Sequence, residues 1–338
     1  MAQCPVGHTK GKRVMSGFRP GVPMRNRQEG FTLIEVMIAL VIASIALAAI
    51  FATFNDQHKA YIVQNAVAEM QGNVRGAMQF VDMQARNAGA GIPPAVSMAV
   101  PSLLFNGVTI SMVSGFGVAD GGAEGTDNLY IISLTSVATT IAASMPSTSA
   151  ELKVVDPTGF TEGAIAIIYD DTTADIFQIT KIQSSDHIQH NPQSIFGDEN
   201  KDFQKPYAEG SHVALVSYSG FYVDRTDPAH PALVKDMVID NVLGPHIVAD
   251  DIEDFQVRLV LSDGSEIDPV GVTMAQLTNT RALRFVIVGR TRQADPKWNE
   301  SAAVVMNHAN LTALAPYNHY RRRVLEERVD LRNAGLSP

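Results

Sequence analysis

The stretch "RNRQEGFTLIEVMIALVIASIALAAIF", residues 25–51, decides how the chain begins. From Phe31 to Phe54 the chain runs for 24 residues, and its polar members are Thr32, Glu35, Ser44 and Thr53. A helix of this length can cross a hydrocarbon core about 30 Å thick. The stretch therefore predicts a membrane-spanning helix that carries one carboxylate, Glu35.

Charge is distributed unevenly along the chain. The first 30 residues hold six Lys and Arg side chains against Glu29 alone, whereas the remainder holds 20 basic and 34 acidic side chains. A basic segment before an apolar run follows the positive-inside rule for membrane proteins. An acidic body of this size repels nucleic acid, so we expect no nucleic-acid partner.

Three interpretations of the apolar stretch compete. It could be a plain single-pass anchor, or a secretory signal peptide cut near the small residues Ala46-Leu47-Ala48. In the third interpretation a leader is cut after Gly30, and Phe31 becomes the new N-terminus.

Glu35 distinguishes these interpretations. An ionised carboxylate in hydrocarbon costs at least a few kcal/mol, so such a residue needs a partner. A cut after Gly30 would create an ammonium group on Phe31, four residues before Glu35. In a helical assembly, Glu35 of one subunit can neutralise that ammonium group on its neighbour. A plain anchor or a discarded signal peptide has no use for the acid.

The segment "GFTLIEVMIALVIASIALA", residues 30–48, closely resembles the class III signal of type IV pilins and of the pseudopilins of type II secretion. The matching positions are Gly30, Phe31, Thr32, Leu33, Ile34 and Glu35. The resemblance implies that a prepilin peptidase cuts between Gly30 and Phe31 and methylates the amine of Phe31, and that Glu35 acts in assembly. The leader, residues 1–30, is long for the commoner pilin subtype, and Met15 and Met24 are alternative starts.

The sequence after residue 54 predicts that the same helix continues. No proline occurs between Pro23 and Pro93. Apolar residues recur every three or four positions, which places them on one helical face: Val63, Val67, Met70, Val74, Met78, Val81, Ala85 and Ala88. Gly72 and Gly76 could mark a bend or a close contact, or could simply be exposed positions. We expect the helix to end at Gly89, Gly91 and the two prolines at 93–94.

Beyond the helix, short apolar runs separated by turn residues predict strands. The candidate strands are residues 103–113, 128–134, 164–170, 176–182, 212–223, 232–239, 254–262 and 281–290. The expected fold is α+β and pilin-like, with a long N-terminal helix packed on a mainly antiparallel β-sheet body. The expected divisions are a leader (1–30), a transmembrane helix (31–54), an amphipathic helix (55–90) and an extracytoplasmic β-rich body (91–338).

Two further segments resemble PilW-like minor pilins. "MQFVDMQARNAGAGIPP" (78–94) looks like the end of their long helix, and "YRRRVLEERVDLRNAG" (320–335) looks like their C-terminus, with an arginine cluster and a short strand. The resemblance implies a minor pilin that initiates a type IV pilus or lies at its tip. A J-type pseudopilin of type II secretion is the close alternative. A membrane-tethered periplasmic binding domain is the rival from another class.

The resemblance also implies where the protein acts and with which partners. The expected location is the bacterial inner membrane, crossed once with the body in the periplasm, and then the pilus or cell surface. The expected partners are other minor pilins, the major pilin, the prepilin peptidase and the inner-membrane assembly platform.

The sequence contains none of the catalytic motifs that we looked for. The chain has no Gly-x-Ser-x-Gly elbow, phosphate loop or His-Glu-x-x-His helix, so we expect no enzyme activity. Cys4 is the single cysteine, which rules out a disulfide within the chain. His187 and His190 have a spacing that could serve a metal, but no third ligand lies nearby in sequence, and solvated loop histidines are the alternative.

One acidic segment is a weak calcium candidate, and no other cofactor is expected. In "DENKDFQKPYAE" (198–209), the spacing of a calcium loop is matched by Asp198, Asn200, Asp202 and Glu209. Phe203 stands where such a loop needs glycine, so a solvated loop between strands is the competing interpretation. The three arginines at 321–323 are either a basic docking patch or a surface cluster balanced by Glu326 and Glu327.

Overall fold

A computed structural model describes residues 30–92, 97–98, 112–113, 115–121, 125–183, 186–190, 202–239, 242–299 and 319–333. The chain divides into two compact units, Met1–Lys59 and Ala60–Pro338. The long helix α1, Leu33–Arg86, contributes its first part to one unit and its second part to the other.

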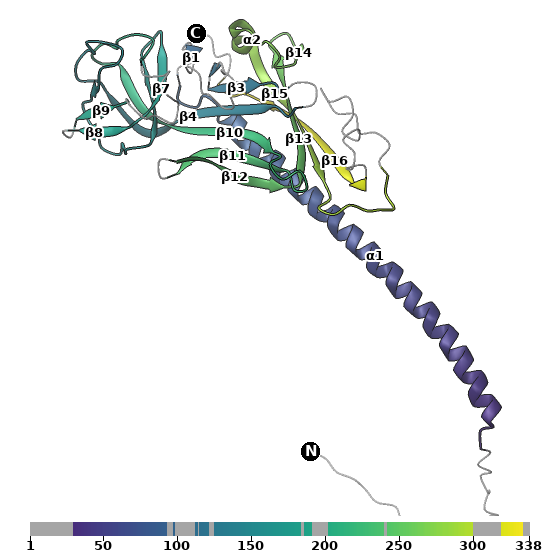
Figure 1. The fold of residues 1–338 in the computed structure, drawn as a ribbon. Coiled ribbons are helices and arrows are strands. Elements are labelled where there is room, and N and C mark those ends of the chain that lie inside the picture. Colours follow the sequence, from purple (N-terminus) through teal and green to yellow (C-terminus); the bar gives the residue numbers. More distant parts are fainter. Residues whose placement is uncertain are drawn as a thin grey trace, which may run out of the picture. The chain divides into compact units, whose positions relative to one another are not determined.

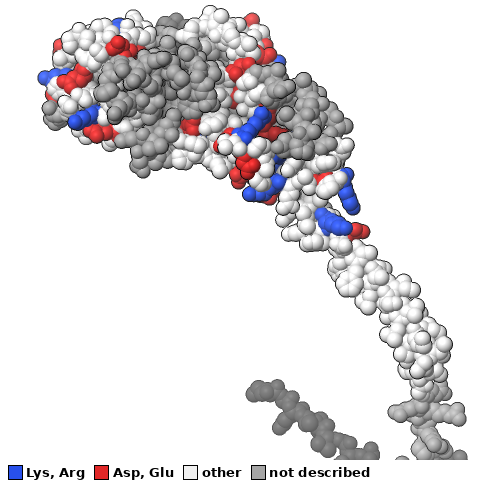
Figure 2. All heavy atoms as spheres, viewed as in Figure 1, with Lys and Arg blue, Asp and Glu red and all other residues white. Residues whose placement is uncertain are grey.

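The first part of α1 is apolar on every side. Its large side chains, among them Leu33, Ile42, Phe51 and Phe54, are more than half exposed. Figure 2 shows this part of the helix as a long uncharged stretch. By length and composition, α1 can cross a membrane. The predicted transmembrane helix therefore exists as a helix with an apolar surface all round.

The second part of α1 is amphipathic, as the spacing predicts. Its buried side chains are Met70, Val74, Ala77, Met78, Val81 and Ala85, and Val63 and Val67 are half-buried. The helix ends at Arg86, four residues before the end predicted at residue 90. Gly89 (φ 69°) and Gly91 (φ 81°) then take left-handed backbone, which glycine adopts readily. The prolines at 93–94 lie outside the described residues.

The larger sheet is antiparallel throughout and has the strand order β1-β2-β3-β4-β10-β11-β12, with β6 and β7 paired at one end of β10. Its strands are β1 (Ser97–Met98), β2 (Met112–Val113), β3 (Phe116–Ala119), β4 (Asn128–Thr140), β6 (Ile165–Tyr169), β7 (Ala174–Gln178), β10 (His212–Asp224), β11 (Ala232–Ile239) and β12 (Val242–Asp250). Figure 1 shows β10, β11 and β12 side by side, with β12 as an edge strand.

Two smaller sheets complete the second unit. A four-stranded sheet has the order β14-β13-β15-β16, formed by β13 (Ile252–Leu261), β14 (Glu266–Ile267), β15 (Thr280–Arg290) and β16 (Arg322–Asp330). A three-stranded sheet has the order β5-β9-β8, formed by β5 (Leu152–Lys153), β8 (Lys181–Gln183) and β9 (His187–Gln189). A short helix, α2 (Met274–Asn279), precedes β15 and starts with a capping box between Thr273 and Gln276.

The α+β fold class is confirmed: one long helix accompanies antiparallel sheets. The predicted strand 232–239 coincides with β11, whereas the predicted strand 176–182 is divided between β7 and β8. Most of the predicted strand 103–113 lies outside the described residues. Strand β12 was not predicted, because its Gly244-Pro245 sequence is typical of a turn; proline is tolerated here since β12 lies at a sheet edge.

One hydrophobic core joins the helix to the larger sheet and to the four-stranded sheet. Val74, Met78 and Val81 of α1 belong to the same buried cluster as Leu129 and Phe221 of the larger sheet. The cluster also contains Phe255, Phe285 and Ile287 of the four-stranded sheet. The helix approaches the backbone closely at Gly289 of β15, where an added Cβ would lie 2.2 Å from Cγ2 of Val74. The helix therefore packs directly on the backbone of β15 at this position.

Gly289→Ala should destabilise the second unit by about 1–3 kcal/mol, because the new methyl group overpacks the contact with Val74. Gly244→Ala is the matched control, since no atom lies within 4 Å of a Cβ added there in β12. Thermal unfolding of the full-length protein in detergent would measure both changes. Equal midpoints for the two variants would contradict the contact, whereas recovery in Gly289→Ala combined with Val74→Ala would support it.

Asp127 fastens the start of β4 to β13. Its Oδ2 accepts a hydrogen bond from the Val257 N–H at 2.7 Å, and its Oδ1 accepts one from the Gly121 N–H at 3.1 Å. Its own N–H donates to the Phe255 carbonyl at 2.8 Å. Burial raises the pKa of Asp127 to about 7, although the bonds from Val257 and Gly121 act to lower it. The side chain thus titrates near neutral pH inside the fold.

This raised pKa predicts the direction of a pH effect. Between about pH 4, the ordinary value for Asp, and about pH 7, the folded state retains a proton that the unfolded chain has lost. The free energy of unfolding should therefore fall by about 4 kcal/mol as pH rises through this window, because each unit of pKa shift corresponds to about 1.4 kcal/mol. Asp127→Asn has no carboxyl group to titrate at this position. The melting temperature of this variant minus that of the wild type should therefore increase from pH 5 to pH 8. A difference independent of pH would contradict the assignment.

Candidate functional site

The peptide bond between Gly30 and Phe31 lies in non-helical backbone ahead of α1, which begins at Leu33. The Phe31 side chain is 86% exposed. Among the described residues, no atom lies within 4 Å of a Cβ added to Gly30. Both flanking residues are thus exposed in the part of the chain that the structure describes.

Glu35 forms a capping box with Thr32 at the start of the helix. The Thr32 N–H donates to Glu35 Oε2 at 2.9 Å, and the Thr32 hydroxyl donates to the same oxygen at 2.8 Å. In return, the Glu35 N–H donates to Thr32 Oγ1 at 3.3 Å. This exchange satisfies backbone donors that a helix N-terminus otherwise leaves unpaired. The Thr-x-x-Glu spacing was the sequence signal for it, and our sequence interpretation did not use it.

The four candidate calcium ligands are not assembled by the described structure. Asp198 and Asn200 lie outside the described residues, while Asp202 and Glu209 are exposed. Among the residues that the structure describes, no three His, Cys, Asp or Glu side chains group closely enough to hold a metal ion. Calcium binding therefore stays a prediction.

The segment after Asp202 is held against β7. Tyr207 donates its hydroxyl to Asp175 Oδ2 at 2.7 Å, and Gln204 donates to the Ala174 carbonyl at 3.0 Å. Phe203 and Tyr207 are buried, so this part of the segment is not a solvated loop. Lys205 Nζ lies 2.5 Å from Asp170 Oδ2. Burial acts to raise the pKa of Asp170, but hydrogen bonds from Lys205, Thr172 and Thr173 together lower it to about 2.

The two histidines differ in environment. His187 is in β9, with Nδ1 2.7 Å from Asp186 Oδ1. His190 is buried, stacks on Phe203 with ring centroids 4.0 Å apart, and has Nε2 3.0 Å from the Ala150 carbonyl. Burial lowers the pKa of His190. The alternative that both are solvated loop histidines is wrong for His190, because an aromatic side chain thirteen positions later in sequence covers it.

The three consecutive arginines have three different environments, which corrects both interpretations of the cluster. Arg322 is buried and makes a bidentate pair with Glu253, with Nε 2.5 Å from Oε2 and Nη2 2.9 Å from Oε1. Arg321 pairs with Asp295 at 2.8 Å and lies 4.2 Å above the Trp298 ring. Arg323 is exposed. The triplet is therefore neither a continuous docking patch nor a cluster balanced by its own strand.

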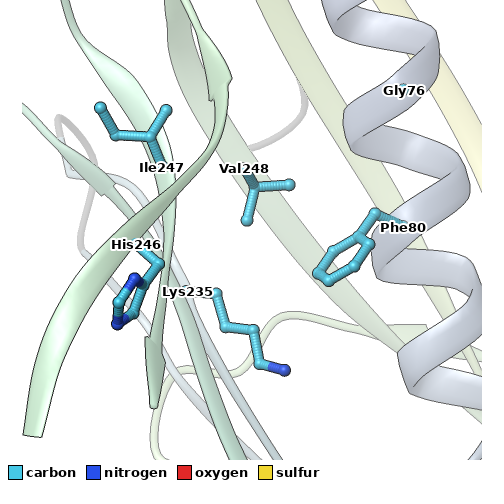
Figure 3. Close-up of a pocket in the computed structure, with 6 residues that line it drawn as sticks. All are labelled: Gly76, Phe80, Lys235, His246, Ile247 and Val248. Carbon is cyan, nitrogen blue, oxygen red and sulfur yellow. The ribbon is translucent and has the colours of Figure 1, made fainter. Parts of the chain in front are cut away.

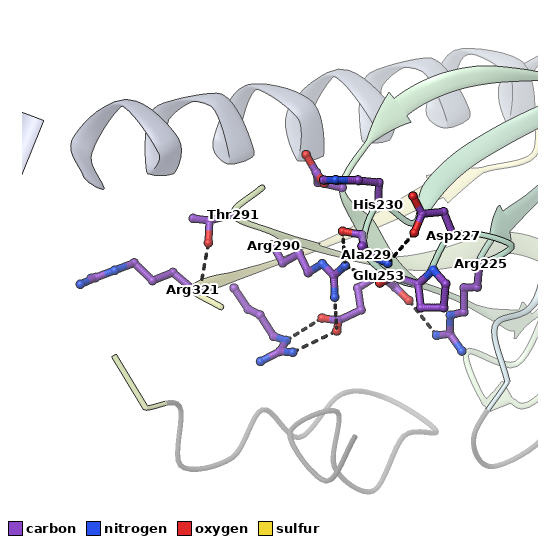
Figure 4. A network of polar contacts seen from close by, with 11 residues as sticks. Arg225, Asp227, Ala229, His230, Glu253, Arg290, Thr291 and Arg321 are labelled. Atoms are coloured by element: carbon purple, nitrogen blue, oxygen red, sulfur yellow. Dashed lines mark hydrogen bonds and ion pairs between the residues drawn. The ribbon is translucent and has the colours of Figure 1, made fainter. Parts of the chain in front are cut away.

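A second arginine completes this buried network, drawn in Figure 4. Arg290 Nη1 lies 3.6 Å from Glu253 Oε1, and Nη2 donates to the carbonyls of Pro228 and Ala229 at 2.6 and 2.8 Å. Its guanidinium lies 4.4 Å from the ring of Tyr320. The network joins β13, β15, β16 and the turn between β10 and β11. We infer that it stabilises the body by tying these elements together.

Removing one partner of a buried ion pair typically costs about 3–5 kcal/mol, because the other charge stays buried. Arg322→Met should therefore destabilise the full-length protein by that amount. The exposed neighbour gives a matched control: Arg323→Met should change stability by less than about 0.5 kcal/mol. Chemical denaturation of both variants would test this. Equal effects would show that Arg322 is no more important to the body than its neighbour.

Comparisons with known proteins bear on the N-terminal segment. Residues 25–51 match the family model described as the prokaryotic N-terminal methylation motif. This match confirms the resemblance found in the sequence of this segment. The chain thus carries a prokaryotic N-terminal methylation motif on a helix that is long and apolar enough to cross a membrane.

The comparisons say less about the body. Among curated proteins no match is found. A type IV-like pilin, TTHA1219 from Thermus thermophilus, is among the similar solved structures, with 9% identity and a TM-score of 0.32 over 78% of this chain and 97% of that chain. At this level of similarity the match by itself defines neither the fold nor the function of the body.

Proposed function

We propose that this protein is a minor pilin of the type IV pilin family, acting in the initiation or tip complex of a type IV pilus. The observation that carries the proposal is the methylation motif at residues 25–51, with Glu35 at the exposed start of an apolar helix. A structural role in assembly, without enzyme activity, follows from membership of that family.

Processing comes first in the proposed mechanism. A prepilin peptidase cuts the exposed bond between Gly30 and Phe31 and methylates the new amine. The ammonium group of Phe31 then precedes Thr32, which already holds Oε2 of Glu35 through two hydrogen bonds. The capping box fixes the direction of the carboxylate before any neighbour arrives. Glu35 Oε1 is left to accept the ammonium group of an adjacent subunit.

Assembly follows from the two halves of α1. The first half offers apolar side chains on every side, which suits bundling with other helices in and above the membrane. The second half is covered on one face by the sheets of the body. The body of residues 91–338 is bulky for a densely packed filament, which favours a subunit present in few copies. Its surfaces would select the neighbouring pilins.

The basic N-terminal segment supports an orientation with the leader in the cytoplasm. The body then lies in the periplasm and later on the pilus or cell surface. The proposed partners are the prepilin peptidase, the assembly platform, other minor pilins and the major pilin. A J-type pseudopilin would share the processing step, and a membrane-tethered periplasmic binding domain would keep its span uncut.

Intact-mass and N-terminal peptide mass spectrometry of the protein from its native membrane tests the proposal. We expect the mature chain to begin at N-methylated Phe31. Glu35→Leu should still be cut after Gly30 but should fall at least about tenfold in the assembled fraction, because the buried charge pair between subunits is lost. An uncut chain, or one cut near Ala48, would overturn the proposal.

Ser44→Ala provides a matched control for the membrane segment. The Ser44 hydroxyl donates to the Val41 carbonyl of its own helix at 2.8 Å, so its loss should affect neither processing nor assembly. If Ser44→Ala and Glu35→Leu reduced assembly alike, a general weakening of the helix, and not charge pairing, would explain the effect.

A further inference from the structure

A groove of about 390 Å³ lies between the second part of α1 and the edge of the larger sheet. Its lining residues come from α1, β11 and β12: Gly76, Phe80, Lys235, His246, Ile247 and Val248. Figure 3 shows Phe80 pointing from the helix toward the strands that carry Lys235 and Val248. We call this feature the α1–β12 groove. It lies wholly within the second unit.

The walls of the groove are mainly apolar. Ile247 is 67% exposed, although it stands in a strand, and Val248 and Phe80 are only partly buried against the core. The Phe80 ring is held in place by an edge contact with Phe221, with centroids 6.0 Å apart. An exposed apolar surface beside a fixed aromatic ring is typical of a surface that another molecule covers.

The charge in the groove is a half-buried lysine. Lys235 Nζ lies 5.7 Å from the centroid of the Phe80 ring, and burial lowers the pKa of this amine. Across the described part of the chain, Lys235 makes no ion pair with a carboxylate. His246 is its cross-strand neighbour in β12, and Asp236, the adjacent acid, bonds instead to Tyr222. A partly desolvated cation that has no carboxylate partner among the described residues makes an incoming carboxylate favourable.

The edge of β12 argues against recognition by strand addition. Pro245 lacks an N–H, and the register shift between Leu233 and Val234 leaves Val248 as an extra residue in β12. Proline and a bulge are devices that keep an edge strand from pairing with another chain. The occupant must therefore be recognised through its side chains.

We propose that the α1–β12 groove is a docking site for a partner protein segment that presents a carboxylate between apolar side chains. The carboxylate would bind Lys235, and the flanking apolar groups would cover Phe80 and Ile247. The docking site itself does not depend on the proposed function. The identification of the partner as a neighbouring pilin does rest on it. Outside the first 30 residues the chain holds 20 basic and 34 acidic side chains, so a site for an acidic segment is distinctive on this body.

Gly76 offers a way to block the groove without disturbing the core. No atom lies within 4 Å of a Cβ added at Gly76, and the same holds at Gly72, one turn earlier on α1. Gly76 lines the groove, whereas Gly72 is not among its lining residues. Gly76→Leu therefore fills the site, and Gly72→Leu is its matched control.

The test uses the full-length protein in nanodiscs of zwitterionic lipid. The probe is a fluorescent peptide, acetylated and amidated, with one Glu flanked on both sides by Leu, Val and Ala, and its twin carries Gln in place of Glu. We expect fluorescence anisotropy to show the Glu peptide binding about tenfold more tightly than its twin. Lys235→Met should remove that difference, whereas Lys181→Met, an exposed lysine in β8, should preserve it.

Gly76→Leu should weaken binding of both peptides at least about tenfold, and Gly72→Leu should leave both unchanged. Three outcomes would each overturn the proposal. They are equal binding of the two peptides, no binding at about millimolar concentration, and equal effects of the two lysine variants. If the protein self-associates and Lys235→Met abolishes this, the occupant of the groove is a second copy of the chain. That result would overturn the proposal that a different protein binds there. These outcomes do not depend on cleavage after Gly30, so the proposed function can fail separately.

Discussion

The packing of the second part of α1 on two sheets at once is the contact on which the body depends. Both sheets contribute to a single core that also contains the apolar face of the helix. Gly289 allows this because the missing side chain lets Val74 reach the strand backbone. The first part of the helix has no such covering and is apolar all round. One continuous helix thus changes composition along its length, from a part apolar enough to cross a membrane to a part with one buried face.

Charged groups inside the body reinforce the join between elements that are distant in sequence. Asp127 bonds the start of β4 to β13, and Glu253 binds Arg322 from the last strand. Both carboxylates are taken out of water, yet each has directed donors that offset the cost. The consequence is that the final strand is bound to the rest of the body by an ion pair as well as by its ladder with β15. Truncation before β16 would therefore leave Glu253 buried without its bidentate partner.

The sequence allowed the helix, its buried face and most long strands to be predicted, because burial repeats with the period of each element. The predicted face from Val63 to Ala88 is the face that packs on the sheets. Strand β12 escaped prediction, since Gly244-Pro245 has the chemistry of a turn and only tertiary context makes it an edge. The burial of Arg322 escaped for another reason: its partner, Glu253, lies 69 residues away. Local spacing led to the predicted cleavage site and to the predicted role of Glu35, whereas Asp198 and Asn200, two of the candidate calcium ligands, fall outside the described residues.

The contact between Val74 and Gly289 also has a mechanical consequence. Val74 occupies the space that a side chain at Gly289 would fill, and Ile287 is the neighbouring side chain on the same face of β15. A shift of α1 in that direction would therefore bring Val74 against Ile287. Tension applied along the helix would then pass to β15 through shape, and from there into the hydrogen-bonded ladders with β13 and β16. Ladders loaded along their strands share force among many bonds. Under load, the body would then move together with the second part of α1, without slipping along it.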